Sequence, residues 1–177
     1  MPYLTSDRLT LRAPEPEDLD IFYRWENDTA LWAFGCAIEP YSRYALRQYI
    51  ATADQDIYAK RQLRLMLERR TDKMVVGAVD LFDFDPLHRR AGVGVLVDRQ
   101  FMRQGFAAEA LTLLVEYAFG MLHLKQLYAH VPADNAACRA LFDHATAFVH
   151  TATLRSWLQR DNTYVDVELW QLIDKNL

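Results

Sequence analysis

The feature that most limits how this chain can fold is a long apolar helix that follows three strand-like runs. Over residues 105–122 apolar side chains lie nearly all round the predicted helix, which is typical of a helix packed on a sheet. The runs before it are "RQLRLMLERR", "KMVVGAVDLFDF" and "AGVGVLV", and a turn near Asp72 joins the first two. The sequence therefore predicts a sheet with this helix across one face.

The rest of the chain extends this pattern at both ends. "RLTLRAP" predicts a strand, and two helices follow, one within residues 15–27 and one capped by Ser42. After the long helix, "KQLYAHVPA" predicts a strand and "DNAACRALFDH" a short helix. A hairpin turning at residues 160–162 closes the chain. The predicted fold is α+β, with a mixed, mainly antiparallel sheet flanked by helices in the order β-αα-βββ-α-β-α-ββ.

Length and composition favour one globular domain over residues 1–177. The chain has 177 residues and no linker-like tract divides it. The net charge of −4 gives no reason to expect a nucleic-acid partner, and no apolar run approaches the ~20 residues of a membrane span. Neither the two cysteines nor the five histidines have metal-ligand spacing, so we expect no metal. A cytoplasmic location is the expectation.

The stretch "FMRQGFAAEA" places a glycine and small residues where the long helix begins. A helix N-terminus leaves amide groups unpaired and carries partial positive charge, which suits a phosphate. Gly105, Ala107 and Ala108 keep side chains out of the way, and Arg103 adds charge. Alternatively, Gly105 is only a turn residue and the alanines only pack against the sheet. The local sequence leaves both interpretations open.

At this point the chain resembles the GNAT superfamily of acyl-CoA-dependent N-acetyltransferases. Their motif R/Q-x-x-G-x-G/A corresponds here to "MRQGFA", with Met102 in place of the polar first residue. A second family motif corresponds in part to "NAACRALFDHATAF", which begins at Asn135. The likeness spans nearly the whole chain and is greatest to the branch of ribosomal-protein and spermidine N-acetyltransferases.

This resemblance implies acetyl-CoA as cosubstrate and assigns roles to several positions. In the family, amides of the glycine loop bind the pyrophosphate, and the backbone of the preceding strand pairs with the pantetheine arm. The residues implied to bind the cofactor are Val95, Leu96, Val97, Arg103, Gln104, Gly105, Phe106, Ala107, Ala108, Asn135 and Phe142. The strand residues can bind the cofactor and also belong to the core, because the cofactor would bind their backbone groups while their side chains pack in the core.

Two departures from the family concern proton transfer. Many relatives have a tyrosine acid where this chain has Phe142, and some have a glutamate base where it has Gly92. Glu39 is the first candidate for the base, followed by Asp83 or a chain of water molecules. The expected substrate side contains Trp32, Phe34, Tyr41 and Asp83. Ordinary packing would equally explain the aromatic residues, and a solvated acidic face would explain the carboxylates.

The resemblance predicts an enzyme that moves an acetyl group from acetyl-CoA to a primary amine by direct attack in a ternary complex. The acceptor would be a protein or peptide N-terminus or a small amine, and polyamine acetylation is a close rival. A CoA-binding module with little catalysis and an unrelated α+β interaction protein are hypotheses from different functional classes. Because relatives often dimerise, a homodimer is a further expectation.

Overall fold

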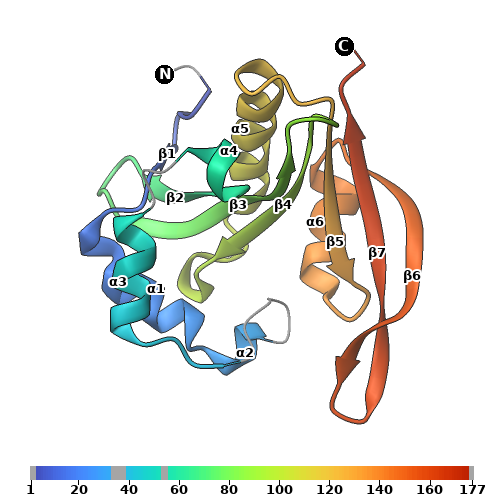
Figure 1. The fold of residues 1–177 in the computed structure, drawn as a ribbon, viewed down its shortest axis with the longest axis horizontal. Helices are drawn as coiled ribbons and strands as arrows, with labels where there is room; N and C mark the ends of the chain where they lie inside the picture. Colours follow the sequence, from blue (N-terminus) through green and yellow to red (C-terminus); the bar gives the residue numbers. More distant parts are fainter. Residues whose placement is uncertain (1–2, 33–38, 53–55, 176–177) are drawn as a thin grey trace.

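Seven strands form one mixed sheet in the order β1-β2-β3-β4-β5-β7-β6 (Figure 1). The computed structural model describes residues 3–32, 39–52 and 56–175. The strands are β1 (Leu9–Arg12), β2 (Leu63–Arg69), β3 (Val75–Asp85), β4 (Arg90–Val97), β5 (Gln126–Pro132), β6 (Val149–Arg160) and β7 (Thr163–Ile173). Every neighbouring pair is antiparallel except β4 and β5.

Helices cover both faces of this sheet. The α-helices are α1 (Leu19–Glu26), α2 (Thr29–Trp32), α3 (Arg43–Ala51), α4 (Ile57–Lys60), α5 (Phe106–Gly120) and α6 (Ala136–Ala145), and the 3-10 helices are η1 (Pro16–Asp18) and η2 (Arg99–Phe101). The main core lies between the sheet and α5 and α6. A second, smaller core packs α1 and α3 against the opposite face, around Phe22, Trp25 and Met66.

The parallel pairing between β4 and β5 is short. It joins Arg90 to Gln126, Ala91 to Leu127 and Gly92 to Tyr128, and no pairing between these two strands follows. Beyond Gly92 the strands diverge, and Figure 1 shows β4 turning away from β5 toward α1 and α3. The sheet therefore has a gap in its middle, which we call the β4–β5 opening: the space between residues 93–97 of β4 and residues 129–132 of β5.

The predicted fold class and element order are confirmed. The long helix covers Phe106–Gly120, and its uniformly apolar surface is explained by burial between the sheet and neighbouring elements. The structure adds two one-turn helices, α2 and α4, that were not predicted. A four-residue helix has too few positions to generate an apolar periodicity, so no pattern marks it. In the described part of the chain, no helix is long and apolar enough to cross a bilayer.

Candidate active site

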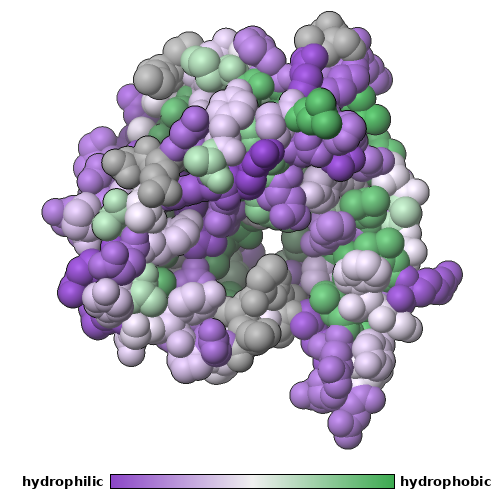
Figure 2. Space-filling model, in the orientation of Figure 1, coloured by the Kyte–Doolittle hydropathy of each residue, from purple (hydrophilic) through white to green (hydrophobic). Residues whose placement is uncertain are grey.

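The β4–β5 opening is the centre of the candidate site. Figure 2 shows a hollow between the part of the molecule that carries β1–β4 and the part that carries β5–β7. Because β4 and β5 are parallel, their carboxyl ends lie on the same side of the sheet, and each leads into a helix. The N-termini of α5 and α6 therefore both lie beside the opening. Each of these helix N-termini carries partial positive charge.

The exposed edge of β4 includes the three residues predicted to pair with pantetheine. Val95, Leu96 and Val97 pair with β3 on one side, and on the β5 side no strand of the described chain pairs with them. Alternate residues in a strand turn their N–H and C=O groups toward opposite neighbours. Some backbone groups of this stretch therefore face the opening, while the side chains pack into the two cores.

The start of α5 has amides without protein acceptors. Gly105 is the N-cap, with φ of 83° and no side-chain cap. Within the described residues nothing accepts a hydrogen bond from the amides of residues 105–108, and the first helical bond runs from the Glu109 amide to the Gly105 carbonyl at 3.2 Å. Arg103 is exposed in the preceding turn and also has a positive φ, of 61°. These amides can bind an anion.

A buried carboxylate, which no sequence pattern indicated, anchors the turn before these amides. Asp98 is 9% exposed and accepts a hydrogen bond from Trp25 Nε1 at 2.9 Å. Arg24 also donates to it, at 2.5 Å. Both partners lie on α1, more than seventy residues earlier in the chain. Such a pairing leaves no local sequence signal, although it links α1 to the entrance of the loop.

The second motif contributes an N-cap and a core residue. Asn135 caps α6, where its Oδ1 accepts from the Cys138 amide at 3.1 Å. Phe142 is only 2% exposed, and its ring packs edge-on against Phe148 with centroids 5.1 Å apart. Burial also raises the pKa of the Cys138 thiol to about 11. Of this group, Asn135 lies at the helix N-terminus beside the opening, while Phe142 belongs to the hydrophobic core.

Asp83 lies where the opening begins, together with two β5 side chains that were not among the predicted site residues. The Tyr128 hydroxyl donates to Asp83 Oδ2 at 3.5 Å, and the ring centroids of Tyr128 and His130 are 5.4 Å apart. Burial and the Asp83 charge raise the Tyr128 pKa, whereas burial lowers the His130 pKa despite the opposing effect of Asp83. We expect Tyr128 protonated and His130 neutral near pH 7.

The Phe82 ring leaves no room for a side chain at Gly92 of β4. A Cβ at Gly92 would lie 2.3 Å from Cε2 of Phe82, so the Phe82 ring occupies the space of any side chain there. The Phe82 ring in turn packs edge-on against Tyr128, with centroids 6.1 Å apart. Asp83 lies on the neighbouring strand β3.

Of the predicted substrate residues, Trp32 lies on α2, Tyr41 lies in the segment that leads into α3, and Asp83 lies on β3. Trp32 Nε1 donates to the Glu26 carbonyl at 2.7 Å, and Tyr41 is tied to Asn27 through its backbone. Glu39 is exposed, and Phe34 lies outside the described residues. These contacts give Trp32 a structural role in joining α2 to α1, and they do not bring Glu39 and Asp83 together.

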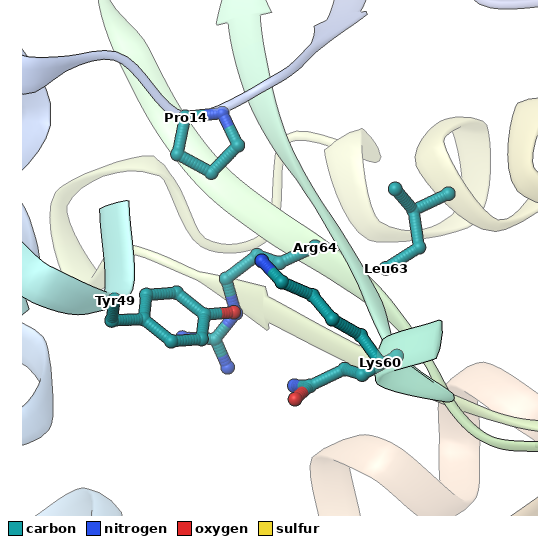
Figure 3. A pocket seen from close by; sticks show the side chains of 6 residues that line it. Pro14, Tyr49, Lys60, Leu63 and Arg64 are labelled. Atoms are coloured by element: carbon teal, nitrogen blue, oxygen red, sulfur yellow. The ribbon is translucent and has the colours of Figure 1, made fainter. Parts of the chain in front are cut away.

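The described residues also line two other hollows. Figure 3 shows a small one where Tyr49, Lys60 and Arg64 converge; its volume of about 20 Å³ suits about one water. It contains two cationic side chains and is unsuited to an amine substrate. An open groove of about 420 Å³ runs between α6 and the β6–β7 hairpin, where Arg139 pairs with Glu168 at 2.9 Å. Across the described ranges, no group of three or more His, Cys, Asp or Glu is arranged to hold a metal.

Comparison with known proteins identifies the family. The model of the acetyltransferase (GNAT) domain matches residues 8–146. An uncharacterised N-acetyltransferase, YoaA, of Bacillus subtilis is 29% identical over 177 residues, covering 97% of each chain. Spermidine N(1)-acetyltransferase of Vibrio cholerae is 24% identical over 163 residues, covering 92% of this chain and 91% of that one.

A solved structure shares the fold. The crystal structure of spermidine N-acetyltransferase from Vibrio cholerae in complex with CoA and spermine superposes with a TM-score of 0.82 at 25% identity, covering 95% of this chain and 96% of that one. The resemblance to GNAT enzymes and to their spermidine branch is therefore confirmed. The chain belongs to the GNAT acetyltransferase family and is an acyl-CoA-dependent N-acetyltransferase.

Proposed function

We propose that this enzyme acetylates a primary amine of a polyamine, with acetyl-CoA as donor. The observation that carries the proposal is the match, over nearly the whole chain, to relatives named as spermidine N-acetyltransferases. An uncompensated acidic group also supports it. Asp83 is exposed beside the β4–β5 opening, and it has no cationic partner among the described residues. Such a carboxylate attracts an ammonium group.

In this proposal acetyl-CoA lies along β4 and ends at α5. Its pantetheine pairs with backbone groups of Val95–Val97, and its diphosphate binds the amides of residues 105–108. The free amides and the bare β4 edge support this placement. Arg103 adds positive charge near the diphosphate. Asn135 is proposed to lie beside the pantetheine arm, and Phe142 to support that wall from the core.

The reaction is proposed as direct attack in a ternary complex. The neutral amine nitrogen forms a bond to the thioester carbon, the carbon–sulfur bond breaks, and CoA leaves as a thiolate. The nitrogen gives up one proton as the amide forms, and this proton passes to the thiolate or to water. A polyamine ammonium with a pKa near ~10.4 must first lose a proton. We propose that Asp83, in contact with Tyr128, holds the ammonium and begins a water-mediated route for that proton. Glu39 becomes the second candidate, because no contact among the described residues ties it to the opening.

The experiment is a CoA-release assay over a panel of amines. We expect kcat/KM for spermidine and spermine to exceed that for an N-terminal peptide and an aminoglycoside by at least about tenfold. Preference for the peptide would contradict the polyamine proposal and favour an α-amine acceptor, whose pKa of about 8 demands less help from a base. Saturable CoA binding without turnover of any amine would favour a CoA-binding module instead.

The homodimer stays a prediction. Sedimentation velocity of the untagged protein would test it, and a monomer at assay concentration would contradict it.

A further inference from the structure

We propose that Arg8 is a positioning residue that holds the Glu109 carboxylate away from the amides of residues 105–108, so that these amides stay available for the diphosphate of CoA. The inference rests on the proposed placement of the cofactor. It concerns a contact between the segment before β1 and the first turn of α5, which are 101 residues apart in the sequence. Neither of the two family motifs quoted above contains either residue.

The contacts between Arg8 and Glu109 are extensive. Arg8 Nε donates to Glu109 Oε2 at 2.7 Å, and Nη2 donates to the same oxygen. The Ser6 hydroxyl donates to the second oxygen, Oε1, so both carboxylate oxygens are engaged. Glu109 is only 19% exposed, and these partners fix it on the β1 side of the helix.

An unrestrained Glu109 would compete with the cofactor. It stands in the first turn of α5, where a carboxylate is attracted by the unpaired amides and the positive end of the helix. In a capping box, a carboxylate one residue earlier in the helix, at the third helical position, turns back and accepts from the N-cap amide. The same attraction acts on a diphosphate. Without Arg8, the helix would carry its own anion beside the site, and CoA would have to displace or tolerate it.

Arg8 also fixes the loop on both sides of Gly105. Its Nη1 donates to the Gln104 carbonyl at 2.9 Å, and its guanidinium lies over the Phe106 ring, 4.9 Å from the centroid. The carbonyl of the residue before the amides is thereby turned toward Arg8. One side chain thus orients the loop and neutralises the carboxylate beside it.

The test compares CoA with pantetheine, which lacks the diphosphate, in calorimetric titrations. We expect Arg8→Gln to weaken CoA binding about tenfold, equivalent to about 1.4 kcal/mol, and to change pantetheine binding less than about twofold. Adding Glu109→Gln to Arg8→Gln should restore CoA affinity to within about threefold of wild type. A purely structural role would weaken both ligands alike and would give no rescue.

Arg43→Gln is the matched control. Arg43 pairs with Asp20, is 51% exposed and lies over the Tyr23 ring at 4.5 Å, while Arg8 is 50% exposed. We expect its CoA affinity to stay within about twofold of wild type.

The remaining outcomes separate the role of Arg8 from the placement of the cofactor. No improvement in the double variant over Arg8→Gln would overturn the role of Arg8. If Arg8→Gln does not fold, Glu109→Gln alone decides, since it should bind CoA at least as tightly as wild type, and about tenfold weaker binding would overturn the inference. If wild type binds pantetheine as tightly as CoA, the diphosphate placement itself is wrong.

Discussion

Two substitutions of Gly105, to alanine and to glutamate, distinguish the effect of backbone strain from the effect of a negative charge in the proposed phosphate site. Gly105 has a φ of 83°, which costs an L-residue about 1–2 kcal/mol. An added Cβ would meet only Arg8 Nη2 at 3.4 Å, an ordinary contact, so no steric clash adds to this cost. Gly105→Ala and Gly105→Glu should therefore lose similar stability, with Tm lower by about 2–8 °C.

The two variants should differ in CoA affinity. A glutamate at this position would place a negative charge close to the diphosphate. Two unit charges about 5 Å apart repel by about 0.8 kcal/mol in water and by about 3.3 kcal/mol at an effective dielectric constant of about 20. We therefore expect Gly105→Glu to bind CoA at least about tenfold more weakly than Gly105→Ala. Calorimetric titration measures the affinity, and thermal unfolding confirms the fold. A folded Gly105→Glu protein with the affinity of Gly105→Ala would refute the placement.

Three further predictions concern the proton route, the core and the acid stability. Asp83→Asn should lower kcat/KM for spermidine by about tenfold and leave CoA affinity unchanged. The control is Asp161→Asn, at an exposed aspartate with the same φ of 49°, which should change neither quantity; equal effects of the two substitutions would argue against a role of Asp83 in the proton route. Phe142→Tyr should lower the free energy of unfolding by about 1–3 kcal/mol, because the tyrosine hydroxyl would enter a site that is 2% exposed. Undiminished thermal stability would show that the hydroxyl finds a hydrogen-bond partner there. The hydrogen bond from Arg12 lowers the pKa of Glu68 from its ordinary value of 4.5, so the ionised Glu68 stabilises the fold above pH ~4.5, and this stabilisation is lost as pH falls through the folded-state pKa. Glu68→Gln should therefore be less stable than wild type at pH 7, and urea titrations should find the stability difference shrinking toward pH 3 rather than staying constant.

The long helix and the strands were predictable because each has a strong local pattern. The helix at Phe106–Gly120 is apolar nearly all round, and the strands before it alternate or run apolar over seven or more residues. For Gly105, the local sequence left open whether the glycine is only a turn residue or keeps the amides at the helix start accessible. In the structure Gly105 is left-handed, and the amides of residues 105–108 have no acceptor among the described residues.

The contacts that organise the site were not predictable, because they join residues far apart in sequence. Arg8 lay in a stretch that predicted only a strand, and Asp98 only followed one. Their partners, Glu109 and Trp25, are 101 and 73 residues away. A weak signal did exist for Tyr128, since Tyr128 and His130 alternate with buried residues along β5. That alternation places both on the sheet face opposite α5, although it cannot reveal Asp83 as a neighbour.

Burial altered the interpretation of the second motif. The family resemblance implied that Phe142 binds the cofactor, and in the structure its ring packs near Phe148 and Trp170 in the hydrophobic core. A sequence motif identifies which residue stands at a position. It does not tell whether a phenylalanine there still faces the ligand or has turned into the core, because both environments favour the same side chain.

A crystal structure of the CoA complex tests the central claim most directly. We expect diphosphate oxygens about 2.7–3.2 Å from the amides of residues 105–108, with Glu109 still held by Arg8. A diphosphate bound elsewhere would contradict the claim, and so would those amides bonded to the Glu109 carboxylate while CoA occupies the β4–β5 opening.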